Sequence, residues 1–352
     1  MSEDIAVREA TAPHTNGTDS ATKLRVVVLG AWGSFGEYGE RDILENAGCE
    51  IVVASPTNED DMIAAAQDAD GIIYTGPISR RFMESLTRCK VIARSAIGMD
   101  NVEGVEIATE RGIVLCNVPD VFVDEVANQT VTLLLACVRH LLPFDTYVRD
   151  GSWANRTPRP NDSVPRITGQ TLGLVGFGNI GRAVTKRMAG FDVQTIAYDP
   201  FLPREVFAAA GARQASLAQV LQDSDFVSIH VPLMPETHHL IGARELRLMK
   251  RSAILINTAR GPVIDEAALI TALQTGAIAG AGLDVTEVEP LPADSPLCMM
   301  KNVVLTPHMA SVSDWANGER RRRPAQEVVA VLSGLRPRAV WNPKVLDRMQ
   351  LR

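Results

Sequence analysis

The sequence lacks the features that mark several special classes of protein. Its five cysteines are widely spaced and form no CxxC pair, which argues against a disulfide framework and a cysteine metal site. Its longest apolar run, residues 131–138, is interrupted by Thr132 and is far shorter than the roughly 18 to 20 residues of a membrane span. Residues 1–22 have no basic start and no apolar stretch, so we expect a disordered tail there and not a signal peptide. We therefore expect a reduced, cytoplasmic protein that does not bind a membrane.

The chain also has fewer basic residues than acidic residues. The chain has 35 Lys and Arg against 42 Asp and Glu, a formal net charge of -7, so its composition does not suggest nucleic acid as a partner. The content of 46% hydrophobic and 22% charged residues is that of an ordinary globular protein. Because 352 residues exceed what one hydrophobic core usually fills, we expect two domains with a cleft between them.

Apolar, β-branched segments alternate with helical stretches along the chain, a rhythm that predicts parallel sheets. In the first part, strands are expected at residues 26–29, 51–54, 71–74, 91–94 and 113–115. A helix at residues 123–140 and a Pro-rich and polar loop at 149–168 follow.

A second α/β unit begins after that loop and has the strand count and rhythm of a doubly wound dinucleotide fold. Its strands are expected at residues 171–175, 193–198, 226–230, 253–257, 279–284 and 303–305. A last helix, at about residues 318–332, lies beyond the final strand, so we expect the chain to return to the first domain. The predicted fold is α/β with two Rossmann-like or flavodoxin-like domains, one discontinuous (23–121 plus 319–352) and one continuous (122–318).

A glycine motif at the start of the second unit indicates a dinucleotide site. Gly176, Gly178 and Gly181 form a GxGxxG motif that follows a predicted strand and opens a helix, which is the context that gives the motif meaning. Gly176 suits the tight turn, Gly178 leaves room for a pyrophosphate, and Gly181 allows close packing of helix and strand.

The identity of the dinucleotide depends on Asp199, which ends the next predicted strand. A carboxylate there can accept hydrogen bonds from the adenosine ribose hydroxyls and repels a 2′-phosphate, so NAD is the predicted cofactor. NADP is the alternative, and Arg204 is the nearby cation that could reach its phosphate.

Two groups after predicted strand ends can bind an anion or move a proton. Arg260 can hold a carboxylate through two hydrogen bonds and polarise the neighbouring carbonyl; a salt bridge across the domains is the alternative. His308 can donate a proton during carbonyl reduction and take one back during alcohol oxidation, unless it is a satisfied core histidine. Glu289 can pair with that imidazole and stabilise its charged form, which extends the pH range for reduction.

These residues give the chain a resemblance to the D-isomer-specific 2-hydroxyacid dehydrogenases, over about residues 23–343. That family includes glyoxylate/hydroxypyruvate reductases, phosphoglycerate dehydrogenases and the C-terminal-binding-protein corepressors. The motifs that carry the resemblance are residues 171–181 with Asp199, 230–241, 257–261 with Asp265, 284–290 and 306–310.

The resemblance implies a catalytic set of Arg260, Glu289 and His308. It also places Asn179 and Ile180 at the pyrophosphate, and it places four further residues near the nicotinamide: Val231, Pro232, Thr258 and Asp284. Residues 94–101 resemble the family's substrate loop, so the backbone amides of Ile97 and Gly98 are expected to receive the substrate carboxylate. The family also pairs its nucleotide domains, which implies a homodimer.

We therefore predict an NAD-dependent D-2-hydroxyacid dehydrogenase that works mainly as a 2-keto acid reductase on a small acid such as glyoxylate or hydroxypyruvate. The substrate domain is then the discontinuous one and the NAD-binding domain is residues 122–318. The alternatives are a phosphoglycerate dehydrogenase-type activity and an NAD(H)-sensing, corepressor-like interaction protein.

Three further features stay open in the sequence. Trp315 is expected either to line the pocket for the substrate side chain or to pack at the domain hinge. Residues 320–323, four consecutive arginines, are expected at the start of the last helix as a solvated or intersubunit face, with a phosphorylated substrate as the alternative. His238 and His239 are adjacent, so on a helix or strand their side chains diverge, and no metal is predicted.

Overall fold

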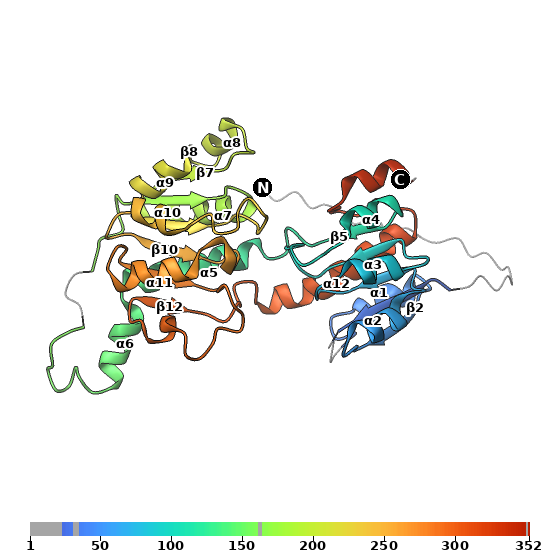
Figure 1. The fold of residues 1–352 in the computed structure, drawn as a ribbon, viewed down its shortest axis with the longest axis horizontal. Helices are drawn as coiled ribbons and strands as arrows, with labels where there is room; N and C mark the ends of the chain where they lie inside the picture. The colour runs from blue at the N-terminus through green and yellow to red at the C-terminus, as the bar shows by residue number, and fades with distance from the viewer. Residues whose placement is uncertain (1–22, 31–34, 161–163, 350) are drawn as a thin grey trace, which may run out of the picture.

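The computed structural model describes residues 23–30, 35–160, 164–349 and 351–352. The expected tail, residues 1–22, lies outside these described residues. The chain forms two lobes, each a parallel sheet covered by helices, and the segments around α5 (Val123–Val138) and α12 (Asp314–Leu332) run between them (Figure 1). The predicted α/β class with two parallel, doubly wound sheets is confirmed.

The first lobe holds a five-stranded parallel sheet in the order β2-β1-β3-β4-β5, the flavodoxin-like order. Strands β1, β3, β4 and β5 are almost wholly buried and apolar, as expected of parallel strands covered on both faces, whereas the edge strand β2 is half-exposed. The strands are β1 (Arg25–Leu29), β2 (Glu50–Ala54), β3 (Gly71–Ile73), β4 (Val91–Ala93) and β5 (Val114–Cys116). The helices are α1 (Glu40–Asn46), α2 (Glu59–Ala66), α3 (Arg80–Ser85) and α4 (Val105–Glu110).

The second lobe holds a seven-stranded parallel sheet in the order β12-β11-β10-β9-β6-β7-β8, which is the Rossmann order with one extra strand. The strands are β6 (Thr171–Val175), β7 (Gln194–Tyr198), β8 (Ala212–Gln214), β9 (Phe226–Ile229), β10 (Ile254–Asn257), β11 (Gly280–Leu283) and β12 (Val303–Leu305). The helices are α7 (Asn179–Met188), α8 (Arg204–Ala209), α9 (Leu217–Asp223), α10 (Ala243–Leu248) and α11 (Glu266–Gln274). The chain reverses its direction of winding between β6 and β9, where ligands of such sheets bind.

The last helix completes the core of the first lobe. Ala325, Val328 and Val331 of α12 are buried in one cluster with Val26 and Val91 of the first sheet. Ser313 accepts a hydrogen bond from the N–H of Ala316 and caps the helix, which therefore begins at Asp314, four residues before the expected start. The predicted domain boundary at residue 319 consequently falls inside α12.

Two elements were not expected from the sequence. The edge strand β8 is short and mostly polar, and α6 (Leu141–Arg149) continues the chain just after α5 with no buried residue. Among residues 23–30, 35–160 and 164–349, no single helix is long and apolar enough to cross a membrane, and only α5 and α6 taken together, bent by 61°, reach that length and composition.

Candidate active site

The glycine turn after β6 has the geometry of a phosphate site. Gly176 has a φ of 95°, and a Cβ there would lie 2.7 Å from the carbonyl carbon of His230. Gly178, the residue before α7, has open space around the position of a Cβ. A Cβ on Gly181 would lie 2.7 Å from the carbonyl oxygen of Gly176. Since the first turn of α7 has no acidic residue, its N–H groups and positive helix end face an open surface that suits a pyrophosphate.

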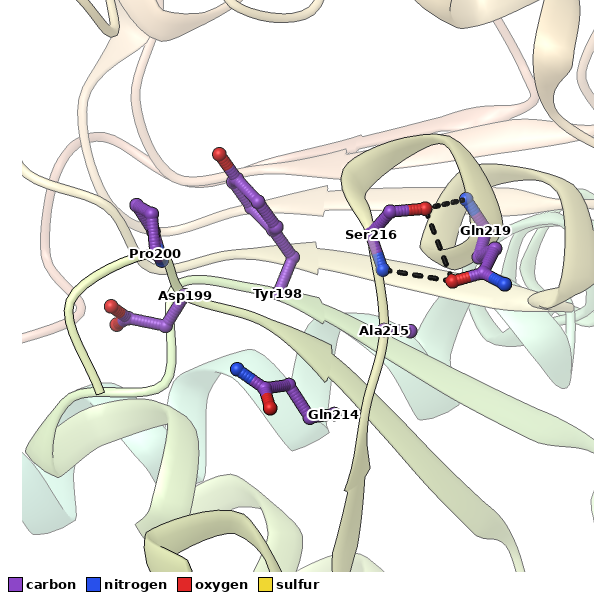
Figure 2. A pocket seen from close by; sticks show the side chains of 7 residues that line it. All are labelled: Tyr198, Asp199, Pro200, Gln214, Ala215, Ser216 and Gln219. Carbon is purple, nitrogen blue, oxygen red and sulfur yellow. Dashed lines mark hydrogen bonds between the residues drawn. The ribbon is translucent and has the colours of Figure 1, made fainter. Parts of the chain in front are cut away.

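Asp199 marks the adenosine end of this turn. Its carboxylate accepts the N–H of Phe177 and the N–H of Phe201, both at 3.0 Å, so it links the glycine turn to the end of β7. Asp199 also lines a pocket of about 350 Å³ between the end of β7 and the start of α9. Figure 2 shows its other walls: Tyr198, Pro200, Gln214, Ala215, Ser216 and Gln219. The nearest wall residues offer no cation, and this arrangement suits ribose hydroxyls better than a 2′-phosphate.

The segment after β9 faces the glycine turn. His230 is half-buried, and its Nε2 lies 2.9 Å from the hydroxyl of Ser228. Desolvation lowers the pKa of His230 to about 3, which disfavours its charged form. Pro232 is exposed and Val231 half-buried at this edge. Thr258 is buried, and its hydroxyl lies 2.8 Å from that of Thr130 on α5.

Arg260 is presented by a turn directly after β10. The side chain of Asn257, the last residue of that strand, accepts the N–H of Ala259 at 3.0 Å and donates to the carbonyl oxygen of Arg260 at 2.9 Å. Sequence reasoning missed this role of Asn257, although an Asn at a strand end is a known turn former. A Cβ on Gly261 would overlap the backbone of Thr286, so the Arg260 turn lies directly against the loop that carries Glu289.

The guanidinium of Arg260 reaches across to the first lobe. Its Nη2 and Nε both lie 3.2 Å from Oδ1 of Asp100, so the expected alternative of a salt bridge across the domains is present. Both side chains keep partial exposure, 30% for Arg260 and 26% for Asp100. A Cβ on Gly98 would lie 1.9 Å from Nη2 of Arg260, so only glycine lets the guanidinium come this close to the substrate loop. Asp100 was not predicted as a partner.

The buried side chain of Arg94 holds the substrate loop in place. This guanidinium is 2% exposed and donates to the carbonyl oxygens of Thr75 and Gly76, each at 2.7 Å, and to Oδ1 of Asn101 at 2.6 Å. Burial lowers the pKa of Arg94, and the charge of Asp100 opposes that shift. The loop carbonyl of Ile97 accepts from the side chain of Asn117 at 2.8 Å. Arg94 thus joins the two loops that follow β3 and β4.

Ile97 also packs the substrate loop against the same apolar cluster as the glycine turn. The Ile97 and Ile180 side chains, one from the substrate loop and one from the glycine turn, pack against a single buried cluster between the lobes. The cluster consists of Val118, Val121, Phe122, Val126, Ala310 and Ala316. The two loops are therefore coupled through apolar packing.

His308 and Glu289 form the pair expected from the sequence. Nδ1 of His308 lies 2.7 Å from Oε2 of Glu289, and the side chains are 48% and 36% exposed. The other carboxylate oxygen of Glu289 accepts the N–H of Thr286 at 3.1 Å, which fixes the carboxylate. With Nδ1 engaged, Nε2 of the imidazole is the nitrogen left to face a substrate.

Asp284 clamps the loop that carries His308. It is 2% exposed and accepts hydrogen bonds from the Thr306 hydroxyl at 2.5 Å and from the N–H groups of Met309 and Ala310 at 3.0 and 2.9 Å. His308 has a φ of 51°, a left-handed conformation that a non-glycine residue adopts at a cost, and the clamp stabilises it. The carboxylate of Asp284 therefore fixes the loop that carries His308.

Three further features of the sequence lie outside this set. Residues 320–323 are half-buried, and Arg322 pairs with Glu319 at 2.7 Å and Arg323 with Asp120 at 3.3 Å. They lie beyond the first turn of α12, so their expected position at the start of the helix is wrong. Trp315 is 56% exposed. The rings of His238 and His239 do not diverge but stack with their centroids 4.0 Å apart, because the two residues occupy a turn.

Together, the candidate residues converge on one edge of the second sheet. Arg260, Glu289 and His308 follow three neighbouring strands, β10, β11 and β12, at their carboxyl ends. The carboxyl ends of β6 and β9 carry the glycine turn and Val231 on the same edge. The arrangement brings a guanidinium, a paired imidazole and a glycine turn that suits a pyrophosphate to one edge of the sheet.

Comparison with known proteins finds one matching family and several similar proteins. Residues 131–310 match the family described as D-isomer specific 2-hydroxyacid dehydrogenase, NAD binding domain. The chain is 39% identical over 294 residues to a glyoxylate reductase of Korarchaeum cryptofilum, which covers 83% of this chain and 88% of that protein. It is 37% identical to a D-3-phosphoglycerate dehydrogenase of Methanocaldococcus jannaschii over 83% of this chain and 55% of that protein.

A solved structure extends the likeness to the whole fold. The NADPH-dependent glyoxylate/hydroxypyruvate reductase of Sinorhizobium meliloti, in complex with NADP and malonate, superimposes with a TM-score of 0.78 at 31% identity. The match covers 91% of this chain and 97% of that one.

Proposed function

This chain belongs to the D-isomer specific 2-hydroxyacid dehydrogenase family, and we propose that it reduces a small 2-keto acid, such as glyoxylate or hydroxypyruvate, with NADH. It is an oxidoreductase that acts on the CH–OH group of 2-hydroxy acids. The observation that carries the proposal is the Glu289 and His308 pair, which lies on the same sheet edge as Arg260 and the glycine turn. Its relatives named glyoxylate reductase favour the small substrate.

The cofactor residues fit a dinucleotide. The open space at Gly178 and the helix end at Asn179 and Ile180 would hold the pyrophosphate, with Gly176 and Gly181 shaping the turn. Asp199 would hold the adenosine ribose, and its negative charge supports NAD over NADP. Val231, Pro232, Thr258 and Asp284 would lie beside the nicotinamide. A bound nicotinamide supplies or accepts the hydride.

Arg260 would bind the substrate carboxylate and polarise the adjacent carbonyl. Its planar fork makes two hydrogen bonds to a carboxylate, and the backbone amides of Ile97 and Gly98 would add to them. These groups together would hold the keto carbon in one orientation, and such positioning lowers the barrier to hydride transfer.

His308 would donate a proton to the carbonyl oxygen during reduction and take it back during oxidation. Glu289 stabilises the imidazolium and fixes the ring, while Asp284 holds the loop in the conformation that presents it. Family membership supports the D configuration of the 2-hydroxy acid product.

The assembly and compartment are proposals with separate support. Leu141, Leu142, Val148 and Trp153 are exposed apolar residues on α6 and the turn after it, and they offer a surface for a homodimer through the nucleotide domain. The five cysteines are free, and this state suits the reducing cytoplasm.

Steady-state oxidation of NADH by the purified protein tests the proposal. The panel runs from glyoxylate, hydroxypyruvate and pyruvate to phosphohydroxypyruvate and bulky aryl 2-keto acids. We expect turnover of the smallest acids and, in Arg260→Ala, a loss of about 100-fold or more in kcat/KM. Arg81→Ala, which alters an exposed arginine paired with Asp60, is the matched control. Tight NADH binding without turnover would favour a sensor, and preference for the phosphorylated acid would favour a phosphoglycerate dehydrogenase-type activity.

A further inference from the structure

Two stacked histidines and a glutamate form a cluster on the surface of the second lobe. His238 and His239 lie on the turn at residues 235–239, and Glu287 comes from the loop after β11. One ligand atom from each of the three side chains lies within 4.8 Å of the others. None of the three has a role in the proposed reaction.

Backbone geometry explains why adjacent histidines face the same way. His239 has a φ of 52°, which turns the chain so that its ring stacks on that of His238 with an interplanar angle of 27°. Two hydrogen bonds hold the turn. The hydroxyl of the buried Thr237 donates to the carbonyl oxygen of Pro232 at 2.6 Å, and the N–H of His239 donates to the carbonyl oxygen of Pro262 at 2.8 Å.

Glu287 is held toward the histidines by a second contact. Its Oε1 lies 2.8 Å from Nε2 of His239, while its Oε2 accepts the N–H of Glu266 at 3.1 Å at the start of α11. An outer partner of this kind fixes the orientation of a ligating carboxylate. An exposed ion pair alone would add little to stability, about 0 to 1 kcal/mol.

From this cluster we propose a binding site for a divalent transition metal ion, Zn²⁺, with His238, His239 and Glu287 as its ligands. Two imidazoles and a carboxylate are a ligand set that zinc uses, with a water molecule in the fourth position. Ligand atoms at roughly 2.0–2.1 Å from a tetrahedral zinc lie about 3.3 Å from one another. Side chains that keep solvent exposure can close from 4.8 Å to that spacing by small rotations.

The chemistry of the donors favours a transition metal ion over Mg²⁺. Imidazole nitrogens suit Zn²⁺, Cu²⁺ and Ni²⁺, whereas Mg²⁺ prefers oxygen ligands and keeps its water. A bound ion would join the turn at 235–239 to the loop of residues 284–290, which also carries Glu289. Zinc binding does not depend on the proposed catalytic function.

The test is a Zn²⁺ titration of the full chain, purified without a histidine tag and stripped with a chelator, in competition with a chromophoric zinc indicator. We expect one Zn²⁺ per chain, and binding weakened at least about 10-fold in His239→Gln and in Glu287→Gln. The glutamine at position 287 can still accept the N–H of Glu266, and thermal melting verifies that each variant is folded. His140→Gln, a histidine outside the cluster, is the control and should bind as wild type does.

Cobalt gives an independent readout of the ligands. Co²⁺ in a four-coordinate site of two imidazoles and a carboxylate has visible absorption bands, which we expect in wild type and in His140→Gln but not in His239→Gln. The proposal is wrong if wild type binds no Zn²⁺ in competition with the indicator, if Mg²⁺ displaces the zinc at equal concentration, or if folded Glu287→Gln binds as tightly as wild type. Zinc affinity lost in His308→Gln and kept in Glu287→Gln would place the ion in the active site instead, and this also overturns the proposal.

Discussion

Arg260 and Asp100 form an ion pair between the two lobes, with 3.2 Å between Nη2 of the guanidinium and Oδ1 of the carboxylate. The cation proposed to bind the substrate is thus oriented by an acid of the opposite lobe. Nη1 of the same guanidinium donates to the carbonyl oxygen of Ala259 at 2.8 Å, so contacts on two sides hold the side chain.

The first prediction concerns this orientation. We expect Asp100→Ala to lower kcat/KM for keto acid reduction about 10-fold, because the guanidinium loses a directing partner and samples other rotamers. Asp100→Asn should lose less, since an amide oxygen can still accept from Nε. Steady-state kinetics at saturating NADH measures both, and Asp68→Ala, which removes the partner of Arg25, is the control. Equal activity of Asp100→Ala and wild type would show that Arg260 needs no partner.

The second prediction concerns proton transfer. Glu289→Gln removes the negative charge 2.7 Å from Nδ1 of His308, so the protonated imidazole loses its ion pair. The ring also loses the contact that fixes its orientation, so Glu289→Gln should lower kcat for reduction about 10-fold. His308→Gln should lower kcat about 10² to 10⁴-fold, the usual contribution of a general acid. An unchanged kcat in Glu289→Gln would exclude the proposed role of the carboxylate.

The third prediction concerns the choice of cofactor. Asp199→Asn keeps an oxygen that can accept the N–H of Phe177 but removes the charge that repels a 2′-phosphate. We expect the ratio of kcat/KM for NADPH to that for NADH to rise about 10-fold. Gln214→Ala, on the opposite wall of the same pocket, serves as a control that leaves the charge in place. A ratio that stays constant in Asp199→Asn would show that the preference arises elsewhere.

The fourth prediction concerns the stability of the first lobe at acid pH. Asp70 is 4% exposed, and its carboxylate accepts two hydrogen bonds from Arg88 and one from the N–H of Arg25. Burial alone raises the pKa of Asp70, but these hydrogen bonds and the charge of Arg88 bring its pKa below the ordinary value. Its contribution to the free energy of unfolding is therefore complete above the unfolded-state pKa and is lost as the pH falls through the folded-state pKa.

We accordingly expect Asp70→Asn to lower the free energy of unfolding by about 2 kcal/mol at neutral pH, a value reduced by the partial exposure of Arg88. The difference from wild type should begin to shrink below about pH 4, where the carboxylate of the unfolded chain becomes protonated, and should vanish once the pH is below the lowered folded-state pKa. Urea unfolding at a series of pH values measures it, with the exposed Asp68→Asn as control. A difference that is the same at neutral pH and at acid pH would contradict this account.

Sequence patterns predict the fold well where burial is uniform. The central strands of both sheets, such as β1, β9 and β10, are largely apolar runs, so their positions follow from composition and spacing. The edge strand β8 escapes this reasoning because its Arg213 and Gln214 are exposed and only pairing with β7 defines it. The early start of α12 depends on a hydroxyl cap at Ser313, whose residue type is one that commonly begins a helix.

In the candidate site, too, the sequence predicts some residues and does not reveal the contacts of others. Arg260, Glu289 and His308 can be found because each follows an apolar strand, and the sheet order then brings them to one edge. Asp100 and Arg94 could not be assigned partners, since their contacts cross between loops far apart in the sequence. The stacking of His238 on His239 depends on one left-handed residue, which no periodicity reveals.

The placement of α12 in the core of the first lobe has a consequence for synthesis on the ribosome. Residues 25–116 emerge first, but the apolar face that Val26 and Val91 present is covered only when Ala325, Val328 and Val331 have been translated. The lobe made of residues 123–310 has all its strands before then. The first lobe is therefore synthesised first but completes its core last. Until then it exposes an apolar surface of the kind that chaperones bind.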